Sequence, residues 1–208
     1  MKPLRIAVLL SGGGRTLENF HHRIKAGTLN CEIVAVASSS TKAGGMDKAK
    51  RFGYPVFASD EKDHGKLSDA INEFILQYEP DLVVLAGFLK LYTIPRGYDS
   101  RVVNIHPALV PSFCGPGFYG MRVHKAVVEA GVKLTGCTVH FVSPVYDDGP
   151  ILAQRCVPVL SGDTPEDVAH RVFELECEVY PEALNLIAAG RVKLIDNKVM
   201  IEGEAEWI

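Results

Sequence analysis

Residues 4–20 read LRIAVLLSGGGRTLENF, and this stretch decides the fold class. Its first seven residues form an apolar run interrupted only by Arg5, as expected for a strand covered on both faces. A glycine turn at 11–14 follows, and we expect a helix over 16–25 that closes at Gly27. A strand that passes through glycines directly into a helix is typical of an α/β protein with a parallel sheet.

The same alternation continues along the chain. We expect further strands at 32–37, 55–57, 81–86 and 102–105, and helices at 43–52 and 66–78. In the C-terminal half we expect a helix at 124–130, antiparallel strands at 134–142 and 151–159, a long helix at 165–189 and a hairpin of 193–195 with 199–201. The predicted fold is therefore a Rossmann-like, mostly parallel α/β sheet with helices on both faces and an appended antiparallel strand pair.

Composition limits the classes of function. The 208 residues include 22 Lys and Arg against 25 Asp and Glu, a net charge of −3, and 47% hydrophobic residues, so one domain over 1–208 is expected. This balance predicts no nucleic-acid partner, and no apolar run reaches the ~18 residues that a membrane span needs. Five cysteines without Cys-x-x-Cys spacing suggest neither a disulfide framework nor a zinc site. We therefore expect a cytoplasmic protein with no membrane association.

The turn SGGGRT at 11–16 is the first candidate site. Glycines let a backbone approach an anion, and the helix start directs unpaired N–H groups toward it, while Arg15 and Thr16 offer a guanidinium and a hydroxyl. The dinucleotide pattern fails because Leu17 replaces its third glycine and serines at 38–40 replace its acid. The turn predicts a phosphate monoester site, and a turn that needs glycine for steric reasons alone is the alternative.

Asn104-Ile105-His106-Pro107 is the second candidate. Alternate residues of a strand share a face, so Asn104 and His106 project together while Ile105 packs away. Pro107 ends the strand at the carboxyl edge of the sheet, where open α/β sheets bind ligands. An amide beside an imidazole suits stabilisation of an oxyanion. The alternative is a structural Asn next to a hydrogen-bonded surface His.

Asp147-Asp148-Gly149-Pro150 is the third candidate, in the turn between the two antiparallel strands. A carboxylate that reaches His106 would favour its imidazolium and accept a proton, but an acidic turn without function is the alternative. Two other histidines have simpler interpretations. His140, mid-strand, is expected to be a satisfied core or supporting histidine, and His124, at a helix start, a neighbour of the cap.

Together these segments resemble the phosphoribosylglycinamide formyltransferase family, folate-dependent enzymes of purine synthesis. The resemblance is carried by IAVLLSG at 6–12, PDLVVLAGF at 80–88, NIHPALVP at 104–111, GCTVHFV at 136–142 and YDDGPI at 146–151. It implies transfer of a formyl group from 10-formyltetrahydrofolate to the amine of glycinamide ribonucleotide, without a metal, by a monomer or homodimer. The alternatives are a 10-formyltetrahydrofolate hydrolase, a formyltransferase acting on another amine, and an α/β module that binds folate or a nucleotide without catalysis.

The resemblance also implies roles for individual residues. Asn104 and a cationic His106 would donate to the oxyanion, and Asp147 would hold His106 and relay the proton of the amine. Residues 1–100 would form the phosphate-binding half, and residues 101–208 the catalytic and folate-binding half. The ribonucleotide would contact Gly13, Gly14, Arg15, Thr16 and Glu176. The folate would contact His64, Phe88, Leu89, Lys90, Leu91, Tyr92, Asn104, Ser143, Pro144, Val145, Tyr146 and Asp147.

Three positions depart from the pattern of many relatives. Arg15-Thr16 stands where many have Ser-Asn, which adds a positive charge. The second acid, Asp148, leaves open which aspartate serves His106. The loop 113–120 is longer than in many relatives, and it would either cover the ribonucleotide or contribute to a subunit contact.

Overall fold

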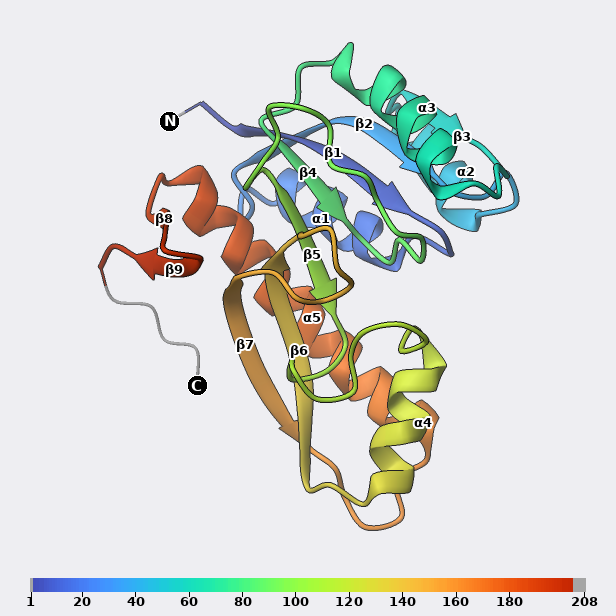
Figure 1. Ribbon diagram of the computed structural model, residues 1–208, viewed down its shortest axis with the longest axis vertical. Helices are drawn as coiled ribbons and strands as arrows, with labels where there is room; N and C mark the ends of the chain where they lie inside the picture. Colours follow the sequence, from blue (N-terminus) through green and yellow to red (C-terminus); the bar gives the residue numbers. More distant parts are fainter. Residues whose placement is uncertain (1, 204–208) are drawn as a thin grey trace.

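Seven strands form the central sheet of the computed structural model, which describes residues 2–203 (Figure 1). They are β1 (Leu4–Leu10), β2 (Cys31–Ser38), β3 (Val56–Ala58), β4 (Leu82–Leu85), β5 (Val102–His106), β6 (Leu134–Phe141) and β7 (Ile151–Pro158). Their spatial order is β3-β2-β1-β4-β5-β6-β7, with parallel pairing from β3 to β5 and antiparallel pairing for β5–β6 and β6–β7. The predicted α/β fold with an appended antiparallel pair is confirmed.

Five helices cover the sheet on both faces. They are α1 (Arg15–Lys25), α2 (Gly44–Arg51), α3 (His64–Leu76), α4 (Met121–Ala130) and α5 (Pro165–Ala188). Strand β1 shows how the faces divide, because its side chains alternate. Ile6, Val8 and Leu10 belong to the core that includes residues of α1 and α5, whereas Ala7 and Leu9 belong to the core that includes residues of α3.

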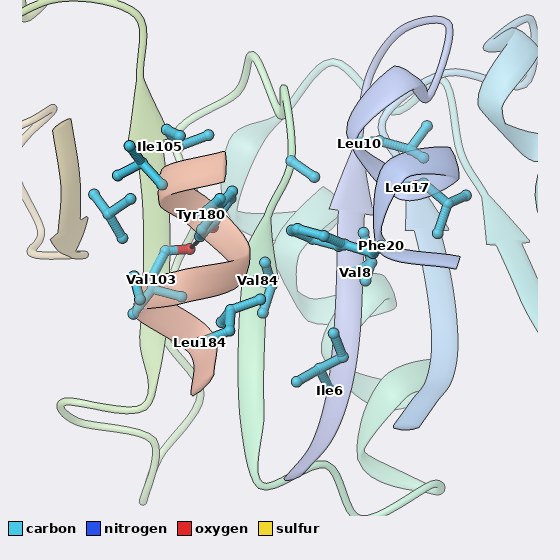
Figure 2. Packing of buried hydrophobic residues seen from close by; sticks show 14 of the residues in the cluster. Ile6, Val8, Leu10, Leu17, Phe20, Val84, Val103, Ile105, Tyr180 and Leu184 are labelled. Carbon is cyan, nitrogen blue, oxygen red and sulfur yellow. Dashed lines mark hydrogen bonds between the residues drawn. The ribbon is translucent and has the colours of Figure 1, made fainter. Parts of the chain in front are cut away.

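Helix α5 anchors the middle of the sheet. In Figure 1 it passes behind β5 and β6. Figure 2 shows Tyr180 of this helix near Phe20 and Val103. The rings of Tyr180 and Phe20 pack edge to face, with their centroids 5.3 Å apart. The buried Tyr180 hydroxyl donates to the carbonyl oxygens of Leu85, at 3.0 Å, and Val103, at 3.1 Å. The helix is thereby tied to β4 and β5, the two strands whose carboxyl ends border the candidate site.

Element boundaries differ from the sequence expectations by a few residues. Helix α3 begins at His64 rather than at 66 because the Asp63 side chain accepts the Lys66 N–H as an N-cap. Strand β5 extends to His106, and α4 begins at Met121 rather than at 124. The closing hairpin is β8 (Val192–Ile195) with β9 (Lys198–Ile201). Within residues 2–203, no helix has the length and apolar character needed to cross a membrane.

Candidate active site

A cavity of about 590 Å³ lies at the carboxyl edge of β1, β4 and β5. Its wall includes the turn 12–16 after β1, the segment 85–92, the end of β5 with the loop 115–120, and the turn 143–147 after β6. Ligands of open α/β sheets bind at this edge, beyond the carboxyl ends of the strands. The structure therefore brings the three candidate motifs of the sequence together in one cavity.

The glycine turn contains two kinds of glycine. Gly14 has φ +68°, and a Cβ added there would lie 2.6 Å from the Cα of Gly45, so this position requires glycine on steric grounds. A Cβ added at Gly12 or Gly13 would meet no protein atom within 4 Å. No side chain caps the N-terminus of α1, which begins at Arg15. The turn thus presents an open backbone surface and a helix start, which suits an anion.

Arg15 extends from this turn over helix α5. Its guanidinium carbon lies 3.9 Å from the centre of the Phe173 ring, which is a cation–π contact. Glu176, one helical turn after Phe173, also borders the cavity. Burial raises the pKa of the Glu176 carboxyl to about 7, and the nearby Arg15 charge opposes this rise. Phe173 was not predicted from the sequence as part of the site.

Asn104 and His106 occupy the end of β5, as their spacing predicts. Asn104 pairs across the strands with His140, and its Nδ2 lies 3.1 Å from His140 Nε2. His106 is 4% exposed, and its Nε2 lies 2.8 Å from the carbonyl oxygen of Phe113. A carbonyl oxygen only accepts, so His106 carries a hydrogen on Nε2. Its Nδ1 faces Asp147 Oδ2 at 3.4 Å.

The structure distinguishes the two acids of the turn. The Asp147 side chain is 10% exposed, and its carboxylate lies against His106 and also accepts the N–H of Gly115 at 2.9 Å. Asp148 is exposed to solvent. Asp147 has φ +53°, and a Cβ added at Gly149 would lie 1.7 Å from the carbonyl oxygen of Phe141. This tight turn directs Asp147, and not Asp148, toward His106.

His140 orients the other members of the cluster. Its Nδ1 lies 2.9 Å from the carbonyl oxygen of Phe141, which places a hydrogen on Nδ1. Nε2 then accepts from Asn104 and lies 3.6 Å from Asp147 Oδ1. One N–H of the Asn104 amide is used in this contact, and its second N–H remains for a ligand. The expectation of a satisfied supporting histidine agrees with this geometry.

Burial sets the charge state of the pair. It lowers the pKa of His106 below the ordinary value, although the Asp147 carboxylate and the Phe113 carbonyl act in the opposite direction. Burial alone would raise the pKa of Asp147, but the neighbouring His140 and His106 rings and the N–H of Gly115 outweigh it, so this pKa is lowered. Asp147 is therefore ionised at neutral pH, and both ring nitrogens of His106 face acceptor oxygens. The charge on His106 that the resemblance implies therefore stays a prediction.

The residues predicted to contact folate fall into three groups. Most of them border the cavity: Phe88, Leu89, Lys90, Leu91, Tyr92, Asn104, Ser143, Val145, Tyr146 and Asp147. Pro144 borders an adjacent second cavity instead. His64 does not line the main cavity, and its Nδ1 accepts the N–H of Leu91 at 3.2 Å, so it supports the segment 88–92 from behind.

The Ser11 hydroxyl joins the two ends of the cavity. It accepts the N–H of Leu89 at 2.9 Å and lies 2.6 Å from the Ser39 hydroxyl. The glycine turn and the segment 88–92 are therefore fixed to each other through one side chain.

Among residues 2–203, no three His, Cys, Asp or Glu side chains gather in a way that could hold a metal ion.

Comparisons with known proteins agree with this geometry. A family model described as "Formyl transferase" matches residues 4–184. The chain is 38% identical to the chloroplastic phosphoribosylglycinamide formyltransferase of Arabidopsis thaliana, over 93% of this chain and 71% of that protein. It is 39% identical to the trifunctional purine biosynthetic protein adenosine-3 of Gallus gallus, over 92% of this chain but only 19% of that longer protein.

Solved structures extend the similarity to three dimensions. Glycinamide ribonucleotide transformylase 1 of Symbiobacterium toebii superposes with a TM-score of 0.88 at 36% identity, over 96% of this chain and 94% of that one. A formyltetrahydrofolate deformylase of Pseudomonas syringae superposes with a TM-score of 0.86 at 27% identity, over 96% of this chain and 66% of that one.

Proposed function

The chain belongs to the formyl transferase family, and from that membership we propose that it transfers a formyl group from 10-formyltetrahydrofolate to the amine of glycinamide ribonucleotide, a step of purine synthesis. One observation carries the proposal. An open glycine turn suited to phosphate and a buried Asn104–His106–Asp147 cluster border the same cavity of about 590 Å³. A phosphorylated acceptor bound at the turn can thus present its amine to the cluster.

The acceptor would occupy the end of the cavity formed by α1 and α5. Its phosphate would bind the backbone of Gly13 and Gly14 at the uncapped start of α1, with Arg15 and Thr16 adding a charge and a hydroxyl. Glu176 would accept from hydroxyl groups of the ribose once it ionises. The Arg15 guanidinium is already placed by its stacking on Phe173, so less of its freedom is lost on binding.

The folate would occupy the other end, between the segment 88–92 and the turn 143–147. Both segments offer backbone N–H and C=O groups to the edge of a pterin ring. Ser11 fixes Leu89, and His64 fixes Leu91, so this surface is formed before the ligand arrives. Pro144, on the outer side of this turn, would contribute through the shape of the turn.

The chemistry follows from the state of the cluster. The amine nitrogen forms a bond to the formyl carbon, and the carbonyl oxygen becomes an oxyanion that accepts the free N–H of Asn104. The nitrogen then loses a proton to the His106–Asp147 pair, whose carboxylate and imidazole share it. When the bond between carbon and the folate nitrogen breaks, the pair returns that proton to the leaving nitrogen, which gives the formylated ribonucleotide and tetrahydrofolate.

Hydrolysis of 10-formyltetrahydrofolate is the second candidate, because the deformylase shares this fold. In that reaction a water molecule activated by the same pair would replace the amine. The glycine turn and Arg15 favour the transferase, since a hydrolase has no need of a site for a phosphorylated acceptor.

We extend the proposal to organisation and location. Residues 1–100 would supply the phosphate turn, and residues 101–208 would supply the catalytic side chains. Two parts cross this division: the segment 88–92 of the first half borders the folate end, and Glu176 of the second half borders the phosphate end. The protein would act in the cytoplasm, where its five unpaired cysteines suit a reducing environment, as a monomer or homodimer. Cell fractionation and sedimentation test these two points.

A paired absorbance assay tests the reaction. The chain is incubated with a stable formyl-folate analogue, with and without glycinamide ribonucleotide. Deformylation that requires the ribonucleotide supports the transferase. Equal deformylation in both samples would support the hydrolase, and no reaction in either would contradict both.

A further inference from the structure

His124 differs from the other two histidines that border the cavity. The rings of His106 and His140 each have one nitrogen fixed by a backbone carbonyl. His124, in the first turns of α4, is 6% exposed, and its Nδ1 is the single buried side-chain nitrogen or oxygen without a hydrogen-bond partner among residues 2–203. Neither the sequence nor the proposed reaction gives this ring a task.

A buried nitrogen without a partner destabilises the free protein, because its hydrogen bonds to water are lost and not replaced. The His124 ring also borders the cavity itself. A ligand bound in this cavity would supply the ring with a hydrogen-bond partner that the free protein lacks. A structural histidine would instead be paired, as His140 is.

The position of His124 identifies which ligand passes it. His124 lies in α4, which packs against α5, the helix that carries Phe173 and Glu176 at the phosphate end of the cavity. An acceptor whose phosphate binds at Arg15 and whose amine reaches His106 would occupy the part of the cavity that His124 borders. The folate segments 88–92 and 143–147 border the other end of the cavity.

The charge state of the ring narrows the chemistry further. Burial, reinforced by the charges of His106 and Arg15, lowers the pKa of His124 to about 4, so the imidazole is neutral at neutral pH. A neutral ring suits a neutral hydroxyl or amide group rather than the phosphate, which has Arg15 and the start of α1.

We propose that His124 is a positioning residue for the acceptor, whose imidazole hydrogen-bonds a neutral hydroxyl or amide group between the phosphate and the reacting amine of the ribonucleotide. The inference rests on the proposed function. It assigns His124 to selection of the acceptor, separate from the proton transfer of His106 and Asp147. A phosphorylated compound that lacks this middle part would not use His124.

Three variants test the proposal. His124→Leu keeps an apolar side chain of similar size and removes both nitrogens, whereas His124→Asn and His124→Gln keep a polar atom near the Nδ1 and Nε2 positions, respectively. We expect His124→Leu to raise the KM for glycinamide ribonucleotide about tenfold, with the KM for the formyl-folate within twofold of wild type and the unfolding midpoint unchanged or higher. One amide variant should restore most of the ribonucleotide KM. His170→Asn, on the exposed side of α5, is the matched control.

A readout on the wild-type chain does not depend on folding of variants. The imidazole nitrogen resonances of His124 should shift on addition of glycinamide ribonucleotide but not on addition of inorganic phosphate. Unchanged resonances, an unchanged ribonucleotide KM in His124→Leu, or equal increases in both KM values would overturn the proposal. Failure of the wild-type chain to require the ribonucleotide for deformylation would instead overturn the proposed function.

Discussion

The two ends of the cavity are built on opposite principles. At the catalytic end, His106, His140 and Asp147 are buried and hold one another through hydrogen bonds and close charges. At the phosphate end, the groups offered are an open backbone at Gly12 and Gly13 and the exposed Arg15 stacked on Phe173. The difference indicates that proton transfer requires fixed side chains, whereas anion binding requires accessible N–H groups and a charge that is placed but still exposed.

The largest effect is expected at the catalytic end, where two adjacent acids allow a matched comparison. Asp147→Asn removes the carboxylate beside His106, and we expect kcat/KM to fall by about 10²–10⁴-fold. Asp148→Asn changes an exposed acid of the same turn, and kcat/KM should stay near the wild-type value. Steady-state assays of both variants make the measurement. Similar losses in the two variants would contradict the assignment of Asp147.

At the phosphate end, two neighbouring glycines separate folding from binding. Gly14→Ala forces a side chain into φ +68° and against the Gly45 backbone, so the free energy of unfolding should fall by at least about 1–2 kcal/mol. Gly13→Ala adds a methyl group in open space, so stability should be unchanged while the ribonucleotide KM rises. Urea unfolding and steady-state assays of both variants test this contrast. Equal stability of the two variants would show that the steric argument is wrong.

A smaller effect is expected at Arg15. Arg15→Ala removes a charged donor and should raise the ribonucleotide KM about tenfold, with kcat nearly unchanged. Phe173→Leu keeps the apolar contact but removes the aromatic face, and it should raise that KM only about threefold. A loss in kcat rather than KM would move Arg15 from the phosphate to the reacting centre.

The smallest expected effect is a shift in the pH dependence of activity, set by the pKa of His106. Because burial lowers the pKa of His106, activity that requires the neutral imidazole should rise through a pKa below the ordinary value of about 6.5 and stay level near neutrality. The Asp147 carboxylate raises this pKa, so Asp147→Asn should move it to still lower pH. An NMR titration of His106 in both chains measures the shift. A His106 pKa above 6.5 in the wild-type chain would restore the cationic imidazole.

The fold and half of the catalytic cluster could be predicted from local sequence. Apolar runs followed by glycines define the parallel strands, and the spacing of Asn104 and His106 on one strand places them on one face. The resemblance indicated Asp147 as the acid that serves His106, but local sequence alone does not distinguish it from Asp148, because the geometry depends on the φ of +53° at Asp147 and the contact of Gly149 with Phe141.

Residues that reach the site from distant elements were the harder part. Phe173 lies in a helix whose sequence indicates only an amphipathic pattern, and its contact with Arg15 exists only after α1 and α5 pack together. His124 was interpreted as a neighbour of a helix cap because burial without a partner leaves no local signal. His64 shows the reverse case, since it supports the folate segment without bordering the cavity.

Helix α5 fixes the distance between the middle of the sheet and the side chains at the phosphate end. Its Tyr180 hydroxyl is attached to the carbonyl oxygens of Leu85 and Val103, and Phe173 lies seven residues earlier on the same helix. A helix turns by about 100° per residue, so inserting or deleting one residue between 176 and 180 would rotate Phe173 and Glu176 away from Arg15 while Tyr180 stayed attached. This part of the chain can therefore change its side chains during evolution, but it cannot change its length.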